Sequence, residues 1–197
     1  MGNANFQEAK VPSMDKIEPY NIYVGNELAA QDREMLQING ITHILVAARG
    51  LGQAFPNDFQ YLCFDLVDKK EENIEQYFLK AYQFIEKAGA EGSILVHCEK
   101  GKSRSTAIVI GYLMMKNKHI RLRDAYDLVR QYRNIAQPNV GFMLELENLE
   151  RIITERPDIN FDDLTEEEYQ EILISSRAIT FHQKPPNFFN SRRDQNG

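Results

Sequence analysis

The chain has 197 residues, of which 43% are hydrophobic and 26% are charged, a composition typical of a globular domain of ordinary size. Its net charge of −6 argues against a nucleic-acid-binding protein, because such domains usually carry a basic surface. The two cysteines, Cys63 and Cys98, are too few and too far apart for a disulfide framework, and the four histidines lack the spacing of metal ligands. We therefore expect no metal and no other cofactor.

The N-terminal residues 1–20 contain no apolar run, so we expect no signal peptide and interpret them as a polar arm. Gly2 follows the first methionine as N-myristoylation requires, but Phe6 stands where that motif has Ser or Thr, and we favour an unmodified start. The longest apolar stretch, 107–115, is too short to span a bilayer. We expect an intracellular protein, in the cytoplasm first and in the nucleus as a second compartment.

Beyond residue 20, short apolar segments alternate with segments of helical periodicity. The predicted strands cover 22–25, 41–48, 61–68 and 93–96. The predicted helices cover 27–38, a segment capped by Asn73 and ended by Gly89 and Gly92, 104–116, 122–133, and a segment that contains 142–153. This alternation predicts an α/β domain, 21–157, with a central, mostly parallel sheet flanked by helices.

The C-terminal part differs in composition. Residues 158–177 are acidic, and Thr165 and Glu168 have the spacing of a capping box, so we expect one more helix there. From 178 to 197 the chain is polar and contains two adjacent prolines. We interpret this last segment as a loose tail.

The most informative segment is VHCEKGKSRS, residues 96–105, which lies between the predicted strand 93–96 and the predicted helix 104–116. This order places it at the carboxyl end of a strand and the amino end of a helix. Open α/β sheets bind ligands there, and the free backbone N–H groups of the helix favour an anion. Cys98 would face that positive field, which stabilises its thiolate.

The other side chains of the segment suit a phosphate group. The planar fork of Arg104 can hold two phosphate oxygens, Gly101 allows a tight turn that directs N–H groups inward, and Ser105 can donate a hydrogen bond to the sulfur. We expect His97 to order the loop without transferring protons. The expected phosphate-binding residues are Glu99, Lys100, Gly101, Lys102, Ser103 and Arg104.

These residues resemble the signature H-C-x-x-G-x-x-R-S of the protein tyrosine phosphatase superfamily at every defined position. The segments ITHIL, YLCFDLVD, GYLM, DAYDLVRQYR and QPNVGF are similar to its small, atypical dual-specificity branch, and the resemblance covers roughly residues 22–153. It implies the cysteine-phosphatase fold and catalysis without a metal. It also implies that Asp68, on the loop after the strand that corresponds to residues 61–67, is the general acid and that Asn139 supports the loop.

The resemblance implies a protein phosphatase that hydrolyses phosphotyrosine and phosphoserine/threonine through a phosphocysteine. Its partners would be phosphorylated proteins, with a protein kinase among the candidates. A phosphoinositide phosphatase is the first alternative: Lys100 and Lys102 favour it, but Glu99 stands where that branch tends to carry a lysine. A non-catalytic phosphoprotein-binding module is the second alternative, and the presence of all the catalytic residues argues against it.

Single residues also have competing interpretations. Asp65 is the alternative to Asp68, since it lies nearby on the predicted strand. We interpret Cys63 as a core residue, with a disulfide to Cys98 as the less favoured alternative if their strands are adjacent. His43 is interpreted as a hydrogen-bonded residue at a strand edge.

Overall fold

The computed structural model describes residues 11–180, and within its last helix the side chains up to residue 177. Gly2 and residues 181–197 of the predicted tail lie outside the described part. The described chain forms one sheet in the order β1-β2-β5-β3-β4. The strands are β1 Met14–Ile17, β2 Ile22–Gly25, β3 Ile41–Ala47, β4 Gln60–Phe64 and β5 Ser93–His97. Only the β1–β2 pair is antiparallel, so the mostly parallel sheet is confirmed.

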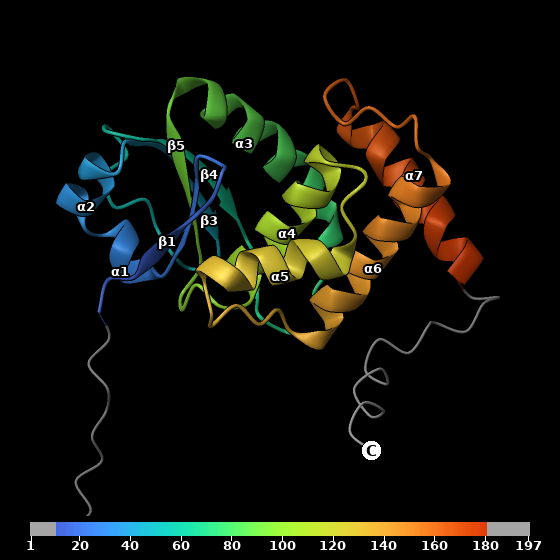
Figure 1. Ribbon diagram of the computed structural model, residues 1–197, viewed down its shortest axis with the longest axis horizontal. Helices are drawn as coiled ribbons and strands as arrows, with labels where there is room; N and C mark the ends of the chain where they lie inside the picture. Colours follow the sequence, from blue (N-terminus) through green and yellow to red (C-terminus); the bar gives the residue numbers. More distant parts are fainter. Residues whose placement is uncertain (1–10, 181–197) are drawn as a thin grey trace, which may run out of the picture.

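Helices cover both faces of this sheet (Figure 1). The helices are α1 Glu27–Ala30, α2 Arg33–Ile38, α3 Phe78–Glu91, α4 Arg104–Lys116, α5 Leu122–Tyr132, α6 Val140–Glu155 and α7 Glu166–Thr180, and a 3₁₀ turn, η1 Glu75–Tyr77, precedes α3. The short helices α1 and α2 lie on one face, and α3 to α6 lie on the other. Helix α7 packs against α3 and α6 on the outside of that second layer.

Two buried clusters hold these layers together. Leu45 and Val96 face the large cluster beneath α3 to α6, whereas Ile44 and Leu95 face the small cluster beneath α2, as alternation along a strand requires. Helix α4 is buried at every position from its first residue to Met115, because α3, α5, α6 and the sheet surround it. The amino end of α4 is therefore held rigidly against the carboxyl end of β5.

Three predicted element boundaries are wrong: those of the N-terminal arm, of the helix 27–38 and of the strand 61–68. Part of the predicted arm, Met14–Ile17, is the edge strand β1, which pairs with β2. The predicted helix 27–38 is two helices, because the carboxylate of Asp32 accepts a hydrogen bond from the Met35 N–H (2.9 Å) and starts a new helix. The predicted strand 61–68 ends at Phe64, which leaves the following four residues in a loop.

The predicted cap at Asn73 is also wrong, since no side chain caps η1 or α3. The Asn73 carboxamide oxygen instead accepts a hydrogen bond from Arg177 of α7 (3.1 Å). The capping box of α7 is present: the Glu168 carboxylate accepts from the Thr165 N–H (2.9 Å), and the Thr165 hydroxyl accepts from the Glu168 N–H (3.2 Å). The helix itself continues to Thr180, into the segment predicted as tail.

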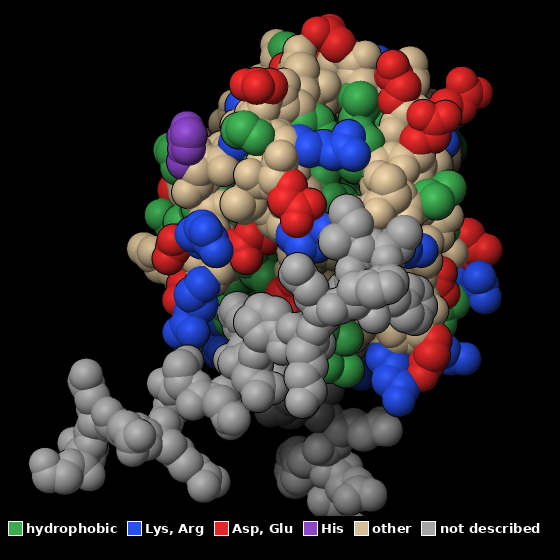
Figure 2. Space-filling view, turned by 90° about the vertical axis from the view of Figure 1, so that its right-hand side faces the viewer, with side chains coloured by type: hydrophobic (Ala, Val, Ile, Leu, Met, Phe, Trp, Pro, Cys, Tyr) green, Lys and Arg blue, Asp and Glu red, His purple; other side chains and the backbone are tan. Residues whose placement is uncertain are grey.

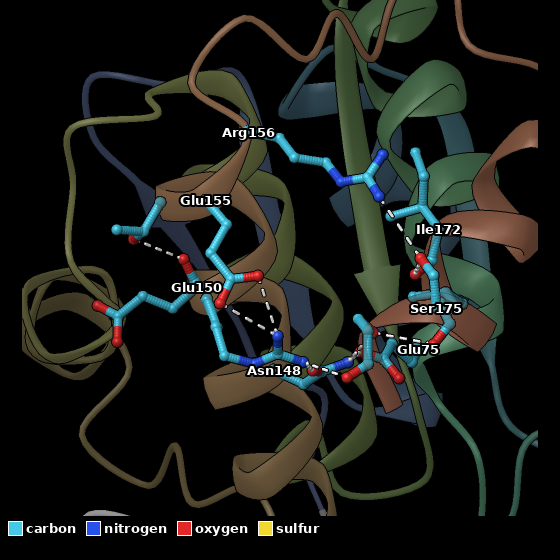
Figure 3. A network of polar contacts seen from close by, with 11 residues as sticks. Glu75, Asn148, Glu150, Glu155, Arg156, Ile172 and Ser175 are labelled. Atoms are coloured by element: carbon cyan, nitrogen blue, oxygen red, sulfur yellow. Dashed lines mark hydrogen bonds and ion pairs between the residues drawn. The ribbon is translucent and has the colours of Figure 1, made fainter. Parts of the chain in front are cut away.

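Polar contacts join α7 to α6 and η1 (Figure 3). The buried carboxylate of Glu75 accepts hydrogen bonds from Asn148 of α6 and from Arg177 of α7, the latter at 3.0 Å. Arg156, just after α6, reaches the Ser175 hydroxyl of α7 at 3.5 Å. The face on this side of the molecule carries charged side chains of both signs around scattered hydrophobic ones (Figure 2). Within residues 11–180, no helix has both the length and the apolar character needed to cross a bilayer.

Candidate active site

The loop from Cys98 to Ser103 connects β5 directly to α4. Gly101 has φ +63°, and a β-carbon at this position would collide with the Gly25 carbonyl and the Arg133 guanidinium. Only glycine fits this left-handed, closely packed turn. The sequence therefore folds the loop around the first turn of α4, where unpaired N–H groups gather.

Cys98 is 2% exposed, and its sulfur lies 3.3 Å from the Ser105 hydroxyl. Burial alone would raise the pKa of this thiol. Hydrogen bonds from the Ser105 hydroxyl and from the Ser105 and Lys102 backbones, together with the charge of Arg104, outweigh burial and lower the pKa below its usual value. The site therefore stabilises the nucleophilic thiolate.

Arg104 is the buried cation of the loop, with 8% of its surface exposed. One terminal nitrogen donates to the Leu66 carbonyl (3.3 Å), and the other lies 3.9 Å from the Glu99 carboxylate. Its Nε is buried and has no hydrogen-bond partner among residues 11–180. A buried N–H of this kind needs an acceptor, and an oxyanion beside Cys98 would supply it.

Asp68 is a carboxylate that lines the same site as Cys98 and Arg104. Its Oδ1 accepts hydrogen bonds from the Ser103 hydroxyl (2.7 Å) and from the Asn139 side chain (2.9 Å). Asn139 also caps α6, because its Oδ1 accepts from the Phe142 N–H (3.0 Å). The alternative acid, Asp65, instead pairs with Arg49 at 2.7 Å at an exposed position. The geometry thus favours Asp68.

A cleft of about 1190 Å³ extends from Cys98 to α5 and α6. It is lined by Asp68, Cys98, Glu99, Lys100, Lys102, Ser103, Arg104, Arg123, Tyr126, Asp127, Arg130, Gln137, Pro138, Asn139, Val140 and Met143. Cations outnumber carboxylates in this lining, whereas the whole chain is negative. The cleft is therefore suited to an anionic substrate.

The remaining predicted residues occupy different places. His97 is buried, and burial lowers its pKa to about 4, which leaves it neutral and unsuited to proton transfer near neutral pH. Its ring lies against the backbone of Cys98, where it can order the loop. The side chains of Glu99, Lys100 and Lys102 are exposed at the cleft, and Ser103 uses its hydroxyl for Asp68. Among the described residues, no cluster of possible metal ligands is present.

Two single-residue interpretations are wrong about where the residue lies. Cys63 is exposed on the edge strand β4 and does not belong to the core. Strand β3 separates it from β5, and both cysteines are free. His43 is hydrogen-bonded as expected, since its Nδ1 lies 2.8 Å from the Thr42 hydroxyl. It is not at an edge, however: it lies on the inner strand β3 and is fully buried, with its ring against Phe84.

Sequence reasoning missed Arg133, Arg123, Tyr126, Arg130 and Met143. Arg133 is fully buried and hydrogen-bonded to the Lys100 and Gly101 carbonyls of the loop. The segment DAYDLVRQYR contained several of these residues, but a helix pattern alone does not reveal that one face borders the cleft. Arg133 is far from Cys98 in the sequence, and no local motif predicts that it contacts the loop.

Residues 22–152 match the family model described as "Dual specificity phosphatase, catalytic domain". Dual specificity protein phosphatase 1 of Arabidopsis thaliana is 41% identical over 147 residues, which are 74% of this chain and 72% of the relative. The crystal structure of DUSP15 is 34% identical with a TM-score of 0.64, over 73% of this chain and 96% of that one. The human tyrosine phosphatase-like serine/threonine/tyrosine-interacting protein is 33% identical with a TM-score of 0.67, over 72% and 97%.

Proposed function

Because the chain belongs to the dual-specificity phosphatase family, we propose that Cys98 removes phosphate from phosphotyrosine and phosphoserine/threonine of protein substrates. The observation that carries the proposal is the environment of the Cys98 sulfur. It is buried at the amino end of α4, 3.3 Å from the Ser105 hydroxyl, in the field of Arg104, and its pKa is lowered. A buried cysteine with a purely structural role usually lacks such surroundings and keeps an unreactive thiol.

In the first step, the Cys98 thiolate attacks phosphorus in line with the leaving oxygen. The Arg104 Nε–H and the loop N–H groups bind the non-bridging oxygens as charge builds on them. The bond between phosphorus and the substrate oxygen breaks, and Asp68 donates a proton to that oxygen. A phosphocysteine and a dephosphorylated protein result.

In the second step, water attacks the phosphocysteine, and the ionised Asp68 takes the water proton. The bond between sulfur and phosphorus breaks, and inorganic phosphate leaves. The hydrogen bond from Ser105 stabilises the departing thiolate, which restores the enzyme.

The test is hydrolysis of a small aryl phosphate, with a chelator present, by wild type and by Cys98→Ser. We expect turnover by wild type, none by the variant, and a phosphate covalently bound to Cys98 after acid quenching. Turnover by Cys98→Ser at the wild-type rate would disprove the cysteine mechanism. Tight binding of phosphopeptide without turnover by the reduced wild-type protein would identify a binding module instead.

The substrate class is tested by comparing phosphopeptides with a phosphoinositide in detergent. The exposed Lys100 and Lys102 would attract either substrate, whereas the exposed Glu99 would repel the more highly charged lipid head group. We expect a higher kcat/KM for phosphopeptides, including peptides from phosphorylated protein kinases. The reverse order would favour the lipid phosphatase.

A further inference from the structure

Arg133, immediately after α5, is a buried arginine that contacts the backbone of the phosphate-binding loop, residues 98–103. Its side chain is 1% exposed. The Nε donates to the Gly101 carbonyl, and one terminal nitrogen donates to the Lys100 carbonyl at 3.3 Å. One guanidinium thus holds two consecutive peptide groups of the loop that surrounds Cys98.

These two hydrogen bonds fix the direction of the loop N–H groups. In a trans peptide, the C=O and the following N–H point in opposite directions. Because Arg133 holds the Gly101 carbonyl outside the loop, the N–H of Lys102 points inward, and this backbone group is one of those that lower the pKa of Cys98. The orientation of Arg133 is therefore transmitted to the sulfur.

The orientation of Arg133 depends in turn on the N-terminal strand. The other terminal nitrogen of Arg133 donates to the Asp15 carboxylate at 2.6 Å and to the Ser13 hydroxyl at 3.3 Å. Strand β1 is held in place by its ladder with β2 and by the Asn26 N–H, which donates to the Ser13 carbonyl (2.9 Å). A buried guanidinium without a counter-charge is costly, so this pair is the natural anchor of Arg133.

We propose that Asp15 is a positioning residue for the phosphate-binding loop, acting through Arg133. Its carboxylate holds the guanidinium where it can bind the Lys100 and Gly101 carbonyls at once. The N-terminal strand is thereby part of the machinery that orders the loop, although it contributes no group to the cleft. This inference rests on the proposed function of Cys98, and the ionisation of Cys98 can be measured whether or not the protein turns over.

The experiment measures the rate of Cys98 alkylation by iodoacetamide against pH in the full chain. All proteins carry Cys63→Ser, because the exposed Cys63 would react as well. The variant is Asp15→Asn, which keeps the size of the side chain. The control is Glu18→Gln, which removes a charge just after β1 that pairs with Lys16 (3.0 Å) rather than with the loop. The charged groups that line the cleft around Cys98 are unchanged throughout: Asp68, Glu99, Lys100, Lys102 and Arg104.

We expect the midpoint of alkylation to move to higher pH in Asp15→Asn, because the Lys102 N–H loses its orientation. A simple charge effect has the opposite sign, since removing a carboxylate favours the thiolate. We also expect kcat/KM to fall about 10- to 100-fold, because a misaligned loop positions the phosphate less well for attack. Inhibition by inorganic phosphate should weaken for the same reason. Glu18→Gln should match wild type in all three.

An unchanged or lowered midpoint in folded Asp15→Asn would overturn the inference, even if its melting temperature falls. If Asp15→Asn does not fold, Arg133→Lys is measured instead, because lysine cannot bind both carbonyls in the same way. A wild-type midpoint in folded Arg133→Lys would also overturn the inference. A shifted midpoint in Asp15→Asn, together with a wild type that never turns over, would leave Asp15 as a positioning residue and refute only the proposed function.

Discussion

The carboxyl group of Asp68 is oriented by two donors on the same oxygen. The Ser103 hydroxyl and the Asn139 amide both donate to Oδ1. Each donor is itself held: Ser103 accepts from the Asn139 N–H (3.1 Å), and Asn139 caps α6. Oδ2 is therefore the oxygen left to carry the proton that the leaving group receives.

Asp68→Asn should separate proton donation from the rest of the chemistry. An amide cannot donate the catalytic proton, so we expect turnover of an alkyl or peptide phosphate to fall about 10²- to 10⁴-fold. Turnover of an aryl phosphate whose leaving group needs no proton should fall much less. Steady-state kinetics on the two substrates measures the difference. Asp65→Asn is the matched control, and a larger loss there would move the acid to Asp65.

Ser105→Ala should raise the pKa of the Cys98 thiol, because it removes a hydrogen bond that favours the thiolate. One charge-assisted hydrogen bond corresponds to a shift of about 1 pH unit in the alkylation midpoint. The thiolate-dependent rise of kcat/KM should then begin at higher pH. Ser175→Ala, which removes a hydroxyl of α7 far from the loop, serves as the control. A midpoint that stays in place would show that backbone N–H groups and Arg104 alone stabilise the thiolate.

At the scale of elements, the sequence predicted those helices, strands and loops whose structure is determined by residues close in the chain. Strand β5, the loop after it and α4 follow one another directly, so apolar pattern, glycine and motif all agreed there. Strand β1 was missed because MDKI becomes a strand only by pairing with β2. The exposure of Cys63 was missed because the apolar run 61–64 does not show that β4 is an edge strand.

The residues of the site also differ in how far the sequence alone predicts them. Cys98, Arg104 and Ser105 lie within one short segment, and their chemistry could be derived from residue types and order. Asp68 required the family resemblance to separate it from Asp65. The pairing of Arg133 with Asp15 joins residues 118 positions apart, and no periodicity or motif predicts such a contact.

Helix α7 contains a buried, unpaired hydroxyl group, and this predicts a stabilising substitution. The Tyr169 hydroxyl is fully buried and has no hydrogen-bond partner among the described residues. Tyr169→Phe removes this unpaired group, so we expect the free energy of unfolding to rise by about 1 kcal/mol. In the matched variant Tyr112→Phe, the lost hydroxyl donates to Glu86 at 2.7 Å, and the free energy of unfolding should fall. Urea denaturation of both variants measures the contrast, and a destabilised Tyr169→Phe would contradict it.

At the scale of the molecule, the buried carboxyl group of Glu75 and the half-buried one of Glu145 lie where η1, α6 and α7 meet. The Glu145 carboxylate accepts the Glu75 N–H at 2.8 Å, and Glu75 accepts from Arg177. Burial, with the nearby charge of Glu75, raises the pKa of Glu145 to about 7. Burial also raises the pKa of Glu75, although Asn148 and Arg177 oppose this. The packing of α7 on the domain is therefore linked to proton binding.

The linkage predicts that the contribution of Glu145 to the free energy of unfolding falls as pH rises. A carboxyl group whose folded pKa is raised favours folding below its unfolded pKa and loses that contribution as pH passes the folded value, here about 7. Between pH 5 and pH 8, Glu145 should cost the wild type on the order of 1 to 2 kcal/mol, after allowance for its partial exposure. In Glu145→Gln this part of the pH dependence should vanish, whereas the exposed control Glu171→Gln should keep it. Urea denaturation at both pH values is the measurement, and equal pH dependence in Glu145→Gln and wild type would show that Glu145 is ionised throughout.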